Sequence, residues 1–199
     1  MGESWPGLTP QGIAAAVIVA GKFGLPLLII RYPFAAAWAN LVLDSVDGDL
    51  LIPLGVPDAL YQPIDKIADW VTYIAMVIAA YRAGWPIRRL VLGLFLFRSI
   101  GQTAFLVTRE ELFLAAFPNF LEPLFLATAS ILAWQRAVRR MPDWRERGFA
   151  VLVRHKWLIG AIVVVYKLQD EYFTHVANVD RSDLFRALLE ALFGGGAAR

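Results

Sequence analysis

Six stretches of about 20 mostly apolar residues limit the fold of this chain more than any other feature, because a helix needs about that length to cross the hydrocarbon core of a membrane. We therefore predict six transmembrane helices, at residues 11–30, 33–52, 65–84, 88–108, 112–135 and 157–177. Hydrophobic residues make up 58% of the 199 residues, against roughly 45–50% in soluble domains. The sequence predicts an all-α, polytopic membrane protein that forms a single transmembrane helical domain over residues 1–199.

The connections between these stretches are short, so consecutive helices are expected to run antiparallel. Pro118 and Pro123 lie inside the fifth stretch and predict a kink there. Residues 181–193 place apolar side chains at helical spacing and precede three glycines, which favours a short C-terminal amphipathic helix on the membrane surface.

Lysine and arginine are distributed unequally between the two sets of connections. One set carries eleven of them and the other four. Because positive residues concentrate on the cytoplasmic side, the richer side is predicted to face the cytoplasm, and the 53–64 loop is predicted to be extracytoplasmic. The basic run 136–147 is expected to be a solvated surface that contacts anionic lipid. We expect an integral protein of a bacterial cytoplasmic membrane.

Composition also excludes some functions. The chain has no cysteine, so it has no disulfide framework and no thiolate metal site. A net charge of +2 is too small to indicate nucleic-acid binding. The expected partner is membrane lipid, and the sequence leaves open a homodimer or a partner membrane subunit.

A cluster of aspartates between the second and third stretches is the strongest functional signal. Asp44 and Asp47 are three residues apart, and Asp65 and Asp69 are four apart, so each pair shares one helix face. Two antiparallel helices can bring both pairs together. Carboxylates at such short range repel one another or require a cation, and their oxygens suit Mg²⁺ or Mn²⁺, with Ca²⁺ also compatible. We predict a divalent-metal site formed by Asp44, Asp47, Asp65 and Asp69.

Other ionisable residues lie within the predicted spans and are expected to point inward and pair, because charges facing lipid are costly. Lys22 and Lys66 belong to this group. Arg98 and Gln102, one turn apart, are candidate donors to an anionic substrate group or to the aspartates, and a buried counter-ion is the alternative for Arg98.

The remaining candidates lie toward the C-terminus. Lys167 is a further substrate-binding candidate that can instead pair with Asp170 or Glu171 on one helix face. Glu171 and His175 have a spacing that can offer two metal ligands, although His175 also fits a hydrogen-bonded residue near a helix end. Glu122 is a buried polar residue that can contribute to a satisfied kink beside the prolines.

The aspartate pattern resembles the CDP-alcohol phosphotransferase family. The family motif is D-x-x-D-G-x-x-A-R, eight residues, then G-x-x-x-D-x-x-x-D, and Asp44, Asp47, Gly48, Asp65 and Asp69 stand at its matching positions. Members are six-helix membrane enzymes. The resemblance implies that the four aspartates hold metal ions, that Asp69 is also the base that deprotonates the acceptor alcohol, and that the substrates are lipids.

Three positions depart from the motif. Leu51 and Ile52 replace its Ala-Arg pair, and Tyr61 replaces its second glycine. The family uses these positions to hold cytidine diphosphate. The family's site also opens to the cytoplasm, whereas the charge distribution predicts the opposite orientation here. The sequence therefore supports the metal site and not the nucleotide site.

Two functions remain open at this point. One is a metal-dependent phosphotransferase that acts on lipid substrates. The other is a non-enzymatic membrane protein, either a cation or proton pathway or an accessory subunit, which uses its buried charges for ion binding or helix packing. Whether the chain is an enzyme is not decided by the sequence.

Overall fold

A computed structural model describes residues 5–110, 112–139 and 143–175, with backbone alone at 138–139 and 170–175. All regular structure in these ranges is helical, which confirms the predicted all-α class. The helices are α1 (Pro10–Ile29), α2 (Pro33–Leu51), α3 (Asp58–Arg82), α4 (Arg88–Thr108), α5 (Leu112–Ala116), α6 (Leu121–Arg139), α7 (Trp144–Arg154) and α8 (Lys156–His175).

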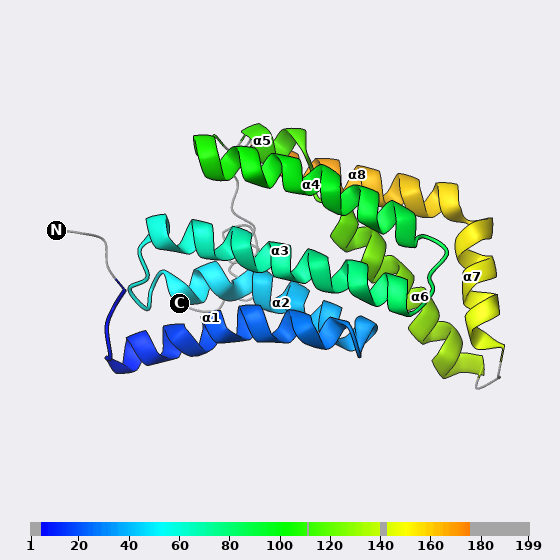
Figure 1. The fold of residues 1–199 in the computed structure, drawn as a ribbon, viewed down its shortest axis with the longest axis horizontal. Coiled ribbons are helices and arrows are strands. Elements are labelled where there is room, and N and C mark those ends of the chain that lie inside the picture. Colours follow the sequence, from blue (N-terminus) through cyan, green and yellow to red (C-terminus); the bar gives the residue numbers. More distant parts are fainter. Residues whose placement is uncertain (1–4, 111, 140–142, 176–199) are drawn as a thin grey trace, which may run out of the picture.

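Helices α1 to α4 run alternately up and down the long axis of the molecule, as the short connections predicted (Figure 1). Helix α1 packs against both α2 and α3, and α3 packs against α4. The turns after α1 and α3 lie at one end of the bundle, which we call the basic end because Arg31, Arg82 and Arg88 flank those turns. The α2–α3 loop lies at the other end, which we call the loop end.

Local sequence accounts for where these helices begin and end. Thr9 caps α1, because its hydroxyl accepts a hydrogen bond of 3.0 Å from the Gly12 amide, and Pro10 fits the first helical turn. Helix α3 ends at Arg82, and Gly84 follows it with a φ of +64° that favours glycine, while the Trp85 amide donates to the Ala80 carbonyl at 2.9 Å. The first signal fixes the start of α1 at the loop end, and the second fixes the α3–α4 turn at the basic end.

The α2–α3 loop is shorter than the predicted 53–64 segment. Helix α3 begins at Asp58, so only residues 52–57 connect the two helices. Pro57 precedes the first turn and Asp58 places a negative charge there, both of which favour a helix start. Pro63 lies inside α3 and lacks the amide that would donate to the Ala59 carbonyl one turn earlier. Tyr61 is consequently a helical residue.

The predicted fifth helix, 112–135, is divided into α5 and α6. Pro118 lies in the break, and the Asn119 side-chain oxygen accepts a hydrogen bond of 3.3 Å from the Glu122 amide at the start of α6. The proline therefore separates two helices, where a kink in one helix was predicted.

Helix α7 was not predicted. It runs across the basic end of the bundle, packs on α6 and meets α8 at a 69° bend (Figure 1). Gly148 lies against α6, since a Cβ added there would be 2.6 Å from the Leu132 Cδ2 atom. The predicted amphipathic helix at 181–193 lies outside the described residues.

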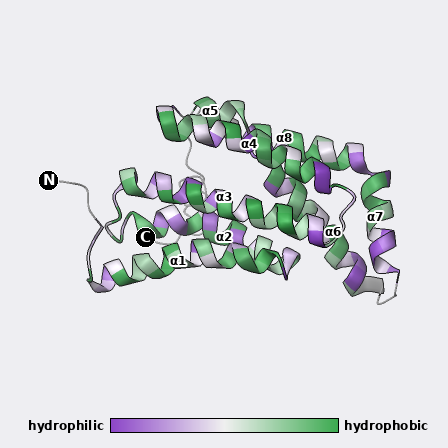
Figure 2. Ribbon diagram, in the orientation of Figure 1, coloured by the Kyte–Doolittle hydropathy of each residue, from purple (hydrophilic) through white to green (hydrophobic). Residues whose placement is uncertain are grey.

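By length and composition, α1 and α4 are able to cross a membrane, and α7 with α8 would supply a third span if the bent pair is one span. This is fewer than the six predicted. The other long helices carry several charged residues, as Figure 2 shows for the second half of α2 and the first half of α3. Large apolar side chains are nevertheless exposed on the outer surface, including Val107, Trp157 and Val165 at 79%, 82% and 69%. Such a surface is typical of a protein in contact with lipid.

Candidate metal centre

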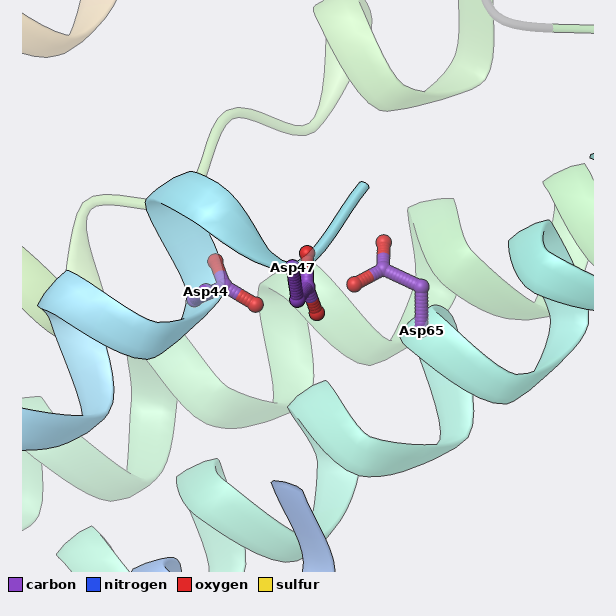
Figure 3. A group of neighbouring side chains, drawn as sticks. All are labelled: Asp44, Asp47 and Asp65. Atoms are coloured by element: carbon purple, nitrogen blue, oxygen red, sulfur yellow. The ribbon is translucent and has the colours of Figure 1, made fainter. Parts of the chain in front are cut away.

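Three of the four predicted metal ligands converge between α2 and α3. One carboxylate oxygen from each of Asp44, Asp47 and Asp65 lies within 4.8 Å of the others. Figure 3 shows the three carboxylates side by side, two from α2 and one from α3. The helical spacing of Asp44 and Asp47 places both on the face of α2 that meets α3. Asp49, two residues further, is exposed on another face.

The ammonium group of Lys22, on α1, lies among these carboxylates. Its Nζ atom is 3.2 Å from Asp44 Oδ1 and 2.5 Å from Asp65 Oδ1, and it also contacts Asp47 Oδ2. Lys22 is 4% exposed and Asp47 is fully buried. The expectation that Lys22 points inward and pairs is confirmed, but sequence reasoning did not assign it to the metal site.

A second lysine links the triad to the fourth aspartate. Lys66 Nζ lies 2.6 Å from Asp65 Oδ2 and 3.7 Å from Asp69 Oδ2. The Gln102 side-chain amide donates to the same Asp69 oxygen at 3.2 Å, as expected for a donor to the aspartates. Together, Lys22 and Lys66 contact all four aspartates.

Tyr61 closes the cluster toward the loop end. Its hydroxyl donates to Asp47 Oδ1 at 2.8 Å. The same hydroxyl would lie 3.1 Å from a Cβ added at Gly48, so the glycine allows the tyrosine to pack directly on α2. Lys22 Nζ is 5.7 Å from the centre of the Tyr61 ring. The sequence marked Tyr61 only as a departure from a motif.

Arg98 donates hydrogen bonds to two backbone carbonyls. Its Nη1 donates to the Leu114 carbonyl at 2.9 Å and to the Phe117 carbonyl at 2.7 Å. These carbonyls belong to α5 and the residue just beyond it, where helical carbonyls lack partners within the helix. The arrangement favours a structural role, and substrate binding by Arg98 stays a prediction.

Glu122 belongs to a polar group next to the α5–α6 break. The Asn119 amide donates to the Tyr73 hydroxyl at 2.7 Å and to Glu122 Oε2 at 3.2 Å. Lys167 on α8 attracts Glu122 electrostatically. Glu122 thus takes part in a satisfied break between helices, one of the roles expected for it.

The other C-terminal candidates lie where side chains are not described. Asp170, Glu171 and His175 are on the last turns of α8, and only their backbone is given. The predicted ion pairs with Lys167 and the predicted Glu171–His175 metal ligation stay predictions.

The chemistry of the triad fits a hard divalent cation. All three side chains offer carboxylate oxygens, the ligand type that Mg²⁺ and Mn²⁺ favour. A cation that bound all three would occupy the space now held by the Lys22 ammonium, so Lys22 would have to withdraw. The site therefore has a built-in positive group that competes with any metal.

No protein-family profile, curated protein or solved structure matches this chain. The resemblance to CDP-alcohol phosphotransferases consequently rests on the spacing of five residues alone.

Proposed function

We propose that this chain is a membrane-embedded protein whose aspartate cluster binds one divalent cation, Mg²⁺ or Mn²⁺, in exchange for the Lys22 ammonium group. The observation that carries the proposal is the convergence of three carboxylate oxygens within 4.8 Å. The three carboxylates of the triad share one ammonium group, and a divalent cation in its place would bring one more positive charge. Buried charges left unbalanced are costly, so neutralisation by a cation would be favourable.

In this proposal, the cluster is the active site of a metal-dependent phosphotransferase that acts on lipid substrates. A bound cation would neutralise charge on phosphoryl oxygens. Asp69 is outside the triad and would accept the proton of an attacking hydroxyl group. Lys66 and Gln102 contact Asp69 and would hold its carboxylate in position. The resemblance to the motif supports these roles, and Tyr61 over Gly48 argues against a cytidine nucleotide as the donor.

A second candidate function is favoured by the position of Lys22. Lys22 and Lys66 contact all four aspartates without any added ion. A network of this kind can fix the register of α1 against α2 and α3, as buried polar groups do in some helical assemblies. The protein would then be a non-enzymatic membrane component, such as an accessory subunit.

Metal binding by Asp47→Asn tests the site itself. Mn²⁺ binding to the purified full-length protein is measured by equilibrium dialysis and by the loss of its free-ion spin-resonance signal. We expect one Mn²⁺ per chain, and at least a tenfold weaker affinity in Asp47→Asn, because one buried charged ligand is lost. Asp49→Asn is the matched control, since Asp49 is exposed on the same helix. Absence of Mn²⁺ binding, or equal losses in both variants, would contradict the metal site.

Turnover by Asp69→Asn tests the enzymatic role separately. Purified protein in lipid nanodiscs is supplied with Mg²⁺ and radiolabelled lipid phosphate or nucleotide-activated lipid, and transfer to lipid acceptors is followed. We expect Mg²⁺-dependent transfer that falls at least 100-fold in Asp69→Asn while the variant still binds Mn²⁺. Metal binding without transfer in the wild-type protein would leave the cluster as an ion site and reject the transferase.

A further inference from the structure

A groove at the basic end of the bundle is separate from the aspartate cluster. It has a volume of about 780 Å³ and lies where the α1–α2 turn, the end of α3, α6 and the start of α7 meet. This size falls within the roughly 300–1,000 Å³ of most small-molecule sites. Its floor is apolar and includes Trp85, Leu132 and Ala133, of which Trp85 is 3% exposed and Leu132 is 7% exposed.

Four arginines from four different segments line the same groove, namely Arg31, Arg82, Arg136 and Arg145. None of the described residues that line it is acidic. The groove is therefore a concentrated positive site, and its charge is complementary to a phosphate or other anionic group. Guanidinium groups are well suited to bind phosphate through paired hydrogen bonds.

Contacts with neighbouring groups hold three of these arginines. Arg31 lies over the ring of Tyr32 at 5.9 Å, and Arg136 lies over the ring of Trp144 at 5.8 Å. Arg145 donates a hydrogen bond to the Ala83 carbonyl, which ties α7 to the end of α3. Two of these contacts involve residues of α7, so its packing across the bundle contributes to the positive rim.

The apolar surroundings of the groove favour a lipid over a water-soluble anion as its ligand. Phe34, at the rim of the groove, is 44% exposed, and Trp38 and Trp134 nearby on α2 and α6 are 42% and 66% exposed. Trp38 also donates to Ser130 of α6 at 3.0 Å, so α2 and α6 are joined next to the groove. Acyl chains can lie along this exposed apolar seam while a headgroup lies among the arginines.

We propose that this groove binds an anionic phospholipid, with the phosphate headgroup among Arg31, Arg82, Arg136 and Arg145. The site lies at the opposite end of α1–α3 from the α2–α3 loop and does not depend on the metal site. The bound lipid would also contact both the α1–α2 turn and the α6–α7 region, which are about 100 residues apart in the sequence.

Native mass spectrometry of the full-length protein in detergent tests the proposal. The protein is titrated with phosphatidylglycerol or phosphatidylcholine of identical acyl chains. We expect at least tenfold tighter binding of phosphatidylglycerol, and loss of that preference in the double variant Arg31→Gln/Arg136→Gln. The matched control is Arg88→Gln/Arg89→Gln, which removes the same charge from exposed residues at the same end of the bundle outside the groove. The control should stay within twofold of wild type.

Ala133→Phe gives a second test in which every arginine is retained. The larger side chain fills the apolar floor and should weaken phosphatidylglycerol binding at least fivefold. Equal losses in the two arginine variants, or equal binding of the two lipids by wild type, would overturn the proposal. Displacement of the lipid by glycerol 3-phosphate at equal concentration would also overturn it, because the occupant would then be a soluble phosphate ester.

Discussion

At the scale of single residues, Lys22 would give the proposed metal site two states. With Lys22 inserted, the ammonium group neutralises part of the buried charge. With a divalent cation bound, the same carboxylates would serve the metal and the lysine would withdraw. One position on α1 would thus limit the cation affinity of the proposed site, because a cation must displace the Lys22 ammonium group from three carboxylates.

Lys22→Met separates these two states experimentally. Without the ammonium group, three carboxylates lose a close positive partner, and the free energy of unfolding should fall by roughly 3–5 kcal/mol in metal-free buffer. Mn²⁺ affinity should rise at least tenfold, and saturating Mn²⁺ should restore much of the lost stability. Thermal unfolding and Mn²⁺ titration of the purified protein measure both effects. Lys156→Met, at an exposed lysine, is the control. Lower stability with unchanged Mn²⁺ affinity would favour the purely structural network.

The sequence predicted the aspartate pairs of the site but not the partners of Lys22, because only the former depend on local helix geometry. Spacings of three and four residues place Asp44 with Asp47 and Asp65 with Asp69, because helical geometry is local. Lys22 is 43 residues from Asp65, and only the packing of α1 against α2 and α3 brings them together. Its burial was predicted from the cost of a charge in lipid, but its partners were not.

At the scale of elements, local signals predicted helix ends well and tertiary packing less well. The apolar stretches predicted the boundaries of α1, α2 and α4 within one residue of those observed. The first turns of α3 were missed because residues 58–64 were assigned to the 53–64 loop. Helix α7 was missed because its polar first half has no continuous apolar stretch, and its packing on α6 provides the stabilisation.

Gly101 tests how closely α5 must approach α4. A Cβ added at Gly101 would lie 2.5 Å from the Phe117 Cβ atom and 2.9 Å from the Phe113 carbonyl. Gly101→Ala should therefore lower the free energy of unfolding by roughly 1–3 kcal/mol through overpacking. Gly93→Ala on the same helix has open space around it and should raise stability by roughly 0.5–1 kcal/mol through helix propensity. Chemical unfolding in detergent compares the two, and a stabilised Gly101→Ala would contradict the observed packing.

At the scale of the whole molecule, the two proposed sites divide the bundle between its two ends. The metal cluster lies between α1, α2 and α3 and is closed by Tyr61 toward the loop end. The arginine groove lies at the basic end under α7. If the basic end faces the cytoplasm, the lipid headgroup site belongs to the inner leaflet and the α2–α3 loop lies outside. The orientation thus determines which substrates can reach the aspartates.

Single cysteines can determine this orientation directly, because the natural chain has none. Asp58→Cys lies at the start of α3 and Pro86→Cys lies in the turn before α4, and both positions are exposed at opposite ends of the bundle. In intact cells, a membrane-impermeant maleimide should label Asp58→Cys and should label Pro86→Cys only after permeabilisation, since positive residues favour the cytoplasmic side. The reverse labelling would place the aspartates near the cytoplasm, where nucleotide-activated donors are available. In that case the motif resemblance would gain support, and the substitution of Tyr61 for glycine would become the main obstacle to a nucleotide substrate.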